Sequence, residues 1–269
     1  MGKCDVRPLR PDEHDEARRE GDDYFDDLAY DGRAQDFGED PDWDADRNRV
    51  TYRATDVAGA HDFGFSDSHH AGGAKRGEVG GTFWRSNHWG YYADRVGPLT
   101  FDDRLEAHGN VILQVGAPDA DMCFGWFRPD SGHEKAPDDT AADAPAPNHG
   151  GDFIGIKVGG PTRVGHYFLP AFAASDRLRG PDRGPVIRPA TVYRWSLVYD
   201  PAANDGNGAI TATLGEESVT HNLKPGQREK ARLARLDHFG VFSTGPGGQI
   251  VKLYLDDLRY TVTRTPAQW

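Results

Sequence analysis

Residues 192–214 read VYRWSLVYDPAANDGNGAITATL and carry the clearest structural signal in the chain. Apolar and polar residues alternate in 195–199 and again in 210–214, as expected of strands with one buried face. The link 200–208 contains an Asp-Gly and an Asn-Gly pair, which favour the turns of antiparallel hairpins. We therefore predict two paired antiparallel strands in this region.

Short apolar stretches of the same kind recur between turn signals along the whole chain. They cover 48–54, 80–84, 109–115, 123–127, 153–158, 192–199, 209–214, 239–242 and 250–254. Only 225–236 has a helical composition, so we expect one short surface helix. Many short strands with almost no helix predict an all-β sandwich, or jelly roll, of two antiparallel sheets with long rim loops.

The chain divides into two parts by composition. Residues 1–23 are almost wholly charged and predict a disordered arm, whereas 24–269 predict a single sandwich domain. Within that domain, 129–152 are rich in Pro, Ala, Asp and Gly without apolar periodicity. We expect them to form a long loop on the rim.

Length and charge exclude several classes of protein. The 269 residues carry a formal net charge of −12, which opposes general binding to nucleic acid or an anionic membrane. No apolar run approaches the roughly 20 residues that cross a bilayer.

We expect a monomer. The N-terminus lacks a hydrophobic signal region, and we expect a secreted or periplasmic protein whose signal is absent from this chain, with the cytoplasm as the alternative.

The most unusual stretch runs from 61 to 93 and combines glycines with ionisable and aromatic residues. It resembles a group of bacterial proteins with a concanavalin A-like (laminin-G-like) sandwich, of the kind found among planctomycete secreted proteins. The matching residues are Trp43, Asn48-Arg49, 63–66 (FGFS), 70–73 (HAGG), 77–81 (GEVGG), Arg85, 91–93 (YYA), 125–127 (GWF), 195–201 and 254–258 (YLDDL).

The resemblance covers roughly residues 25–260 and specifies the fold better than the activity. Relatives of this fold include lectins, glycosidases, polysaccharide lyases and adhesion modules, so function has to be argued from a site. The resemblance implies a polysaccharide or an oligosaccharide as partner. It also implies a structural calcium ion, for which Asp27 and Asp257 at the first and last strands are the candidate ligands. Surface carboxylates without a metal are the alternative, and no organic cofactor is expected.

Four residues are candidate catalytic groups: Glu78, His70, Arg85 and Tyr92. If 77–84 enters a strand, Glu78 and Trp84 share one face and combine a carboxylate with a stacking platform for a sugar ring. A histidine titrates near neutral pH and can act as a general acid or base. The structural alternative is that Glu78 pairs with an arginine and the glycines pack against the other sheet.

Further polar and aromatic residues are candidates for binding a glycan. Trp84 and Trp89 are expected in an exposed cleft, whereas Trp126 and Trp195 lie in hydrophobic strands and are expected in the core. The full set of candidate binding residues is Asn48, Arg49, His69, Trp84, Trp89, Tyr91, His166 and Tyr167.

Three functional classes remain open: a polysaccharide-degrading enzyme, a non-catalytic glycan-binding module, and a structural or adhesion domain. Several ionisable residues in one glycine-rich stretch favour the enzyme. Tyrosine, histidine and arginine suit a lyase that abstracts a proton next to a uronate. A retaining glycosidase needs two opposed carboxylates, and the Glu-x-Asp-x-x-Glu strand of laminarinase-type enzymes is absent from the sequence.

Overall fold

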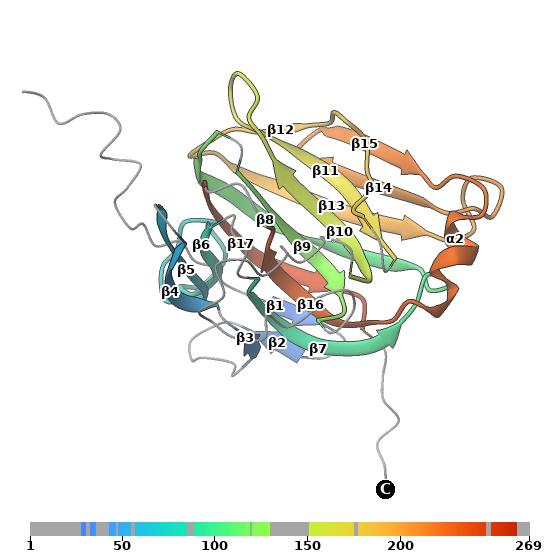
Figure 1. The fold of residues 1–269 in the computed structure, drawn as a ribbon, viewed down its shortest axis with the longest axis horizontal. Helices are drawn as coiled ribbons and strands as arrows, with labels where there is room; N and C mark the ends of the chain where they lie inside the picture. The colour runs from blue at the N-terminus through green and yellow to red at the C-terminus, as the bar shows by residue number, and fades with distance from the viewer. Residues whose placement is uncertain are drawn as a thin grey trace, which may run out of the picture.

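The computed structural model describes residues 28–30, 33–35, 43–46, 48–54, 57–84, 89–118, 120–129, 151–174, 177–245 and 249–262. Within these residues, most strands form two antiparallel sheets that pack face to face (Figure 1). The front sheet has the order β12 (Val186–Ile187), β11 (His166–Ala173), β10 (Phe153–Gly159), β9 (Asp121–Phe127), β16 (Leu236–Ser243), β7 (Tyr91–Leu99) and β3 (Asp44–Asp46).

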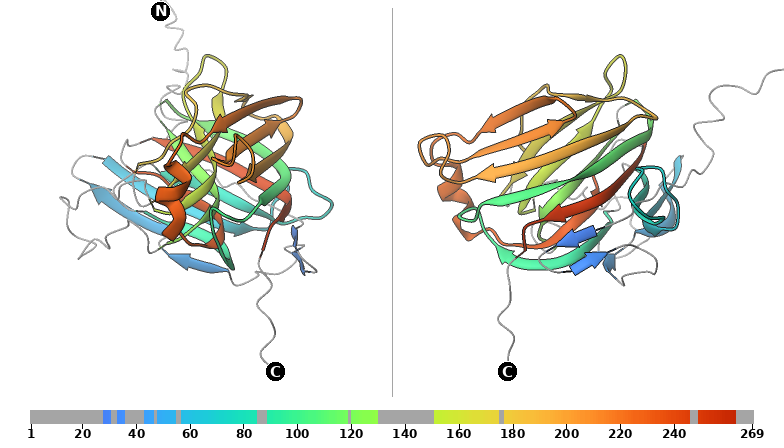
Figure 2. Two further views of the ribbon diagram at one scale, coloured as in Figure 1. Left: turned by 90° about the vertical axis from the view of Figure 1, so that its right-hand side faces the viewer. Right: turned by 180° about the vertical axis from the view of Figure 1, so that it is seen from behind.

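The back sheet covers the other side of the sandwich and faces the viewer in the right-hand panel of Figure 2. Its order is β15 (Glu217–Asn222), β14 (Ala209–Leu214), β13 (Val192–Asp200), β8 (Leu105–Gly116), β17 (Ile250–Tyr260), β6 (Glu78–Trp84), β5 (Val57–Ser66) and β4 (Arg49–Ala54). A small hairpin, β1 (Leu28–Tyr30) with β2 (Arg33–Gln35), lies beside β17. The first and last strands therefore lie close together.

The hairpin read from 192–214 is present. Strand β13 pairs with β14 from Trp195 opposite Leu214 to Asp200 opposite Ala209. The turn between them places Asn204 and Asp205 in the left-handed region, at φ 54° and 55°, where Asn and Asp are better tolerated than most residues. The Asn204 side chain donates to the Leu223 carbonyl at 2.7 Å and ties the turn to the end of β15.

Large aromatic side chains fill the space between the sheets. Trp126 and Trp195 are both buried, which confirms their prediction as core residues. The ring of Trp195 lies 5.0 Å from Phe124 of the front sheet, and Phe239 of the front sheet stacks on Tyr260 at 3.8 Å. Burial of each such side chain contributes about 1.5–3 kcal/mol to stability.

The all-β sandwich predicted from the sequence is confirmed. The predicted helix is also present, as α2 (Gln227–Lys230) followed by the single turn η1 (Ala231–Leu233). Strands β5, β7 and β15 were not predicted, because glycine or polar residues interrupt their apolar pattern. Residues 1–23, and 130–150 of the expected rim loop, lie outside the described residues. No described helix is long and apolar enough to span a bilayer.

Candidate functional site

The glycine-rich turn 67–77 folds over the outer face of the back sheet. Val79 and Phe83 of β6 point into the core, so the alternating residues Glu78 and Trp84 share the outer face of the sheet. A shared face is what the sequence predicted. The two differ in exposure, however. Trp84 is half-buried, whereas Glu78 is 0% exposed because the turn covers it.

Glu78 organises this turn through its carboxylate. Its Oε1 accepts hydrogen bonds from the Ser68 hydroxyl at 2.7 Å and the His70 backbone N–H at 2.5 Å, and its Oε2 accepts from the Ala71 N–H at 2.6 Å. Burial raises the pKa of Glu78 to about 9, and the charge of Asp256 adds to the rise, although the three hydrogen bonds oppose it. Two of its three donors are backbone groups, so Glu78 is part of the framework of the turn.

Asp256 of β17 supports the same turn from the neighbouring strand. It is also 0% exposed and accepts hydrogen bonds from the backbone N–H groups of Gly73 and Asp257. The His70 ring lies on Tyr254, with 4.5 Å between ring centroids. Burial, followed by the charges of Lys252 and His69, lowers the pKa of His70. We call Glu78, Asp256 and the turn 67–77 the turn cluster.

The structure does not gather the predicted catalytic residues in one hollow. His70 and Glu78 meet in the turn cluster, but Tyr92 is 4% exposed and packs between the sheets against Trp43, with 5.1 Å between ring centroids. Neighbouring residues on a strand point to opposite faces, so Tyr91 lies on the outer face of the front sheet, where it is 7% exposed. Arg85 lies outside the described residues.

Two of the predicted binding residues act as braces near β5. Asn48 donates to the Phe63 carbonyl at 3.0 Å, and Arg49 donates to the Phe65 carbonyl at 2.9 Å. Both residues therefore hold β4 against β5. His69 is exposed on the turn cluster, away from the front sheet.

The remaining predicted binding residues lie on or beside the front sheet. His166 is 1% exposed and points into the core, where burial lowers its pKa, although nearby backbone carbonyls of Ala117 and Gly165 oppose the shift. This burial removes His166 from any surface that a glycan could reach. Tyr167 is half-buried on the outer face of β11, and Trp89 is half-buried beside Tyr91, at 5.0 Å.

The predicted calcium pair is described only in part. Asp257 accepts a hydrogen bond from the Asn110 amide at 3.2 Å, and Asp27 lies outside the described residues. Among the residues that the structure describes, no three His, Cys, Asp or Glu side chains are grouped as metal ligands. Calcium binding stays a prediction.

A second polar cluster lies on the outer face of the front sheet, centred on Asp44 of the edge strand β3. Its Oδ2 lies 3.0 Å from the Tyr91 hydroxyl, 3.0 Å from Nε2 of His238 and 3.1 Å from the guanidinium of Arg95. The other ring nitrogen of His238, Nδ1, lies 2.7 Å from the Asp237 carboxylate. We call these five residues, from β3, β7 and β16, the Asp44 cluster.

The pKa of Asp44 shifts in the opposite direction to that of Glu78 under the turn 67–77. Burial alone would raise the pKa of Asp44, but the contacts with His238, Tyr91 and Arg95 outweigh it and lower the pKa. Burial, together with the charge of Asp44, raises the pKa of Tyr91. Tyr91 therefore keeps its proton at neutral pH. Because carboxylates only accept, both contacts of His238 are hydrogen bonds when its ring carries two protons.

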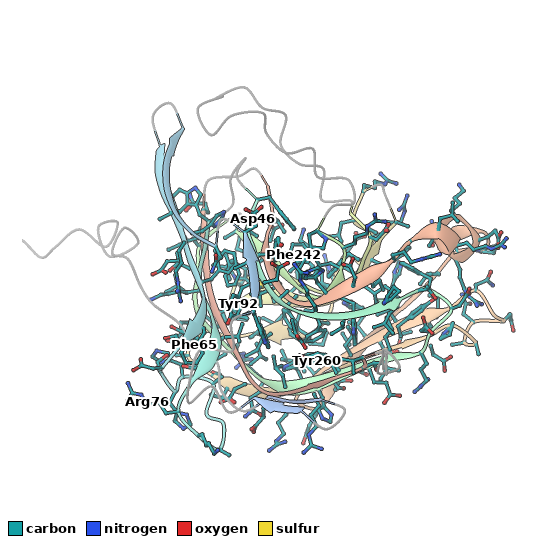
Figure 3. All side chains as sticks on the ribbon, turned by 90° about the horizontal axis from the view of Figure 1, so that it is seen from below. Asp46, Phe65, Arg76, Tyr92, Phe242 and Tyr260 are labelled. Atoms are coloured by element: carbon teal, nitrogen blue, oxygen red, sulfur yellow. The ribbon has the colours of Figure 1, made fainter. Side chains whose placement is uncertain are left out.

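Aromatic side chains border the Asp44 cluster on the same face. Phe242 lies 4.9 Å from Phe127, and Phe127 lies 5.8 Å from the His238 ring. Figure 3 shows Phe242 and Asp46 on the outer side of the front sheet, Tyr92 between the sheets, and Arg76 at the far side of the molecule. The polar groups are graded in exposure: the Arg95 side chain is 73% exposed and that of His238 only 10%.

Four members of this cluster were not predicted from the sequence: Asp44, Arg95, Asp237 and His238. A weak signal for Arg95 existed, because Tyr91 and Arg95 are four residues apart in one strand and must share a face. Nothing local points to Asp44 and His238, which are 194 residues apart in the chain.

Solved structures similar to this chain include enzymes and lectins. An alginate lyase from Pseudomonas aeruginosa is 9% identical over 74% of this chain and 86% of its own, with a TM-score of 0.42. The carbohydrate recognition domain of Emp47p is 8% identical over 84% and 100%, also at 0.42. Lectin I-B4 from Griffonia simplicifolia is 11% identical over 75% and 92%, at 0.39.

No protein-family model matches the chain, and no curated protein matches it by sequence. At TM-scores of 0.39–0.42 and identities of 8–11%, these likenesses support no conclusion about this chain. The function therefore has to be argued from the chemistry of the two clusters.

Proposed function

We propose that the protein binds a polysaccharide on the outer face of the front sheet and cleaves it by β-elimination next to a uronate. The observation that supports this most is the convergence of a tyrosine hydroxyl, an imidazole and a guanidinium on one carboxylate oxygen. Tyr91, His238 and Arg95 all lie within 3.1 Å of Asp44 Oδ2. The elimination requires a proton donor, a proton acceptor and a cation beside the substrate carboxylate.

The three groups can be assigned to these roles from their surroundings. Arg95 is the most exposed and pairs with the uronate carboxylate. His238 removes the proton at C5, once the entering carboxylate has displaced its contact with Asp44. The C5–H electron pair forms the C4–C5 double bond, and the C4–O bond breaks. Tyr91, which stays protonated, gives its proton to the departing oxygen.

The test is incubation with a panel of uronic and neutral polysaccharides. The release of reducing ends reports any cleavage, and the absorbance of unsaturated sugar reports elimination. The proposal predicts unsaturated product from a polyuronate only. Tyr91→Phe is expected to lower the rate by about 10²–10⁴-fold. Tyr193→Phe, on β13 of the back sheet, is the matched control and keeps the full rate. Reducing ends without unsaturated product would contradict elimination.

Binding without cleavage is the second candidate, and one observation favours it. His238 is held between two carboxylates, at 2.7 and 3.0 Å, and a doubly protonated ring has no lone pair to accept a proton. A lectin-like module would use the same face through hydrogen bonds and ring stacking. Retardation of the protein by a polysaccharide, with no product after long incubation, would establish this function instead.

A further inference from the structure

A strongly basic segment lies at one end of an acidic molecule. Residues 224–235 carry five cations and one carboxylate, whereas the whole chain has a net charge of −12. The cations are Lys224, Arg228, Lys230, Arg232 and Arg235, and the carboxylate is Glu229. The segment contains α2 and η1, at the right-hand end of the sandwich in Figure 1.

One of these cations anchors the segment. Arg228 donates to the carbonyls of Phe101, Pro201 and Gly206, at 3.2, 3.1 and 2.8 Å, and pairs with Asp102 at 2.6 Å. Its position is therefore fixed by groups of the sandwich itself. These contacts hold the segment against the sandwich, so the other side chains of the segment have a defined position on its surface.

Three of the other four cations face solvent, and Arg235 is half-buried. Lys224 and Lys230 are exposed, and the Arg232 side chain is 71% exposed. Arg232 forms an ion pair with Glu229 at 3.4 Å, and both side chains of that pair are exposed. Such surface pairs contribute little, so an incoming anion can replace Glu229 without a large loss.

The basic segment continues directly into the Asp44 cluster. Arg235 immediately precedes β16, which carries Asp237 and His238, and its N–H donates to Asp152 at 3.0 Å. Arg95 lies opposite His238 on the adjacent strand β7. The end of β7, the start of β16 and α2 lie at the same end of the sandwich (Figure 1). A chain bound at Arg95 can therefore extend over the basic segment.

We infer that residues 224–235 form a second binding surface, which holds further acidic residues of the polymer that reacts at the Asp44 cluster. The inference rests on the proposed function and narrows its substrate to a long polyanion, in place of a mixed polymer or a short oligomer. Local positive charge on an otherwise acidic protein attracts anions and is screened by salt. Leu233, 82% exposed, is the one large apolar side chain of the segment in solvent, which is too little for docking on a membrane.

The test measures binding of long polygalacturonate, trigalacturonate and dextran to the Tyr91→Phe protein, which holds the polymer without cleaving it. Lys230→Glu/Arg232→Glu is expected to weaken binding of the long polyanion about tenfold at low salt and to flatten its salt dependence. Binding of the trimer at the Asp44 cluster stays unchanged. Arg183→Glu/Arg188→Glu makes the same charge change beside β12, at the edge of the front sheet opposite β3. This double variant is the matched control and should bind the long polyanion with unaltered affinity.

The outcomes separate this inference from the function on which it rests. Equal affinity of the double variant and its control, with cleavage by the wild-type protein intact, would overturn the second surface and leave the elimination standing. Stronger adsorption to phosphatidylserine vesicles than to polygalacturonate would also overturn it. If the wild-type protein neither binds nor cleaves any polymer of the panel, both proposals fail.

Discussion

The turn cluster and the Asp44 cluster are each built around a carboxylate with three close donors, yet they are opposites in chemistry. Glu78 receives two backbone N–H groups and one hydroxyl, all from the turn that covers it. Asp44 receives side chains from two other strands, and its own side chain is 27% exposed. Burial raises the pKa of Glu78, whereas cationic and hydroxyl partners lower that of Asp44.

The difference indicates which carboxylate builds structure and which is available for chemistry. Backbone donors cannot leave without unfolding the turn, so a ligand has no means to exchange with them. Side-chain donors such as Arg95 and Tyr91 can turn toward a substrate at the cost of one hydrogen bond each. We therefore propose a structural role for Glu78 and place the proposed chemistry at the side chains that surround Asp44.

The largest expected effect is on stability, at the turn cluster. Glu78→Ala leaves three donors without their acceptor beneath the turn and is expected to lower the free energy of unfolding by about 3 kcal/mol or more. Urea denaturation measures this. Glu217→Ala, exposed on β15 of the same sheet, is the control and should change stability by less than about 0.5 kcal/mol. A loss as small as the control's would show that Glu78 is no framework residue.

Substitutions in the Asp44 cluster should lower the rate of cleavage more than they lower the stability of the fold. Asp44→Asn keeps the size of the side chain but removes the charge that holds His238 and Arg95. Hydrogen bonds to charged groups contribute about 1.5–3 kcal/mol, so we expect kcat on a polyuronate to fall about 10- to 100-fold. Asp200→Asn, which affects a surface ion pair with Arg104, is the control. An unfolded Asp44→Asn protein would place Asp44 in the framework with Glu78.

The pH dependence of stability should differ in sign between the two clusters. The pKa of Glu78 is raised from 4.5 to about 9 on folding, so its contribution is fully present below pH 4.5 and is lost as pH rises toward 9. The pKa of Asp44 is lowered from 3.8, so its contribution is present above that pH and is lost as pH falls through the lowered pKa.

Two variants isolate these contributions. Glu78→Gln should flatten the decline of stability between pH 4.5 and about 9, and Asp44→Asn should flatten only the acid side. Unfolding free energies from urea titrations across the pH range provide the measurement. A Glu78→Gln protein that parallels the wild type at every pH would mean that folding does not raise the pKa of Glu78.

Much of the fold could be predicted because its signals are local. Alternation in 195–199 and 210–214 sets which side chains enter the core, and turn chemistry in 200–208 sets the pairing. That Glu78 shares a face with Trp84 followed from the same period of two. The burial of Glu78 did not, because that depends on how 67–77 folds over β6.

For the site, the sequence predicted the types of residue but not most of their positions. Tyrosine, histidine and arginine are the residue types that the sequence indicated. Which of Tyr91 and Tyr92 faces outward depends on which residues of β7 point to each side of the sheet. No short-range pattern decides this for a strand that was not predicted. His238 meets Asp44 because β16 and β3 both flank β7, a consequence of sheet order that spans most of the chain.

The most direct test compares two folded variants in one assay of unsaturated product from polygalacturonate. Glu78→Gln, which keeps an acceptor beneath the turn, should form product at close to the wild-type rate, and Tyr91→Phe should form almost none. The reverse result, with Tyr91→Phe active and Glu78→Gln inactive while folded, would contradict the assignment and return the chemistry to the turn cluster.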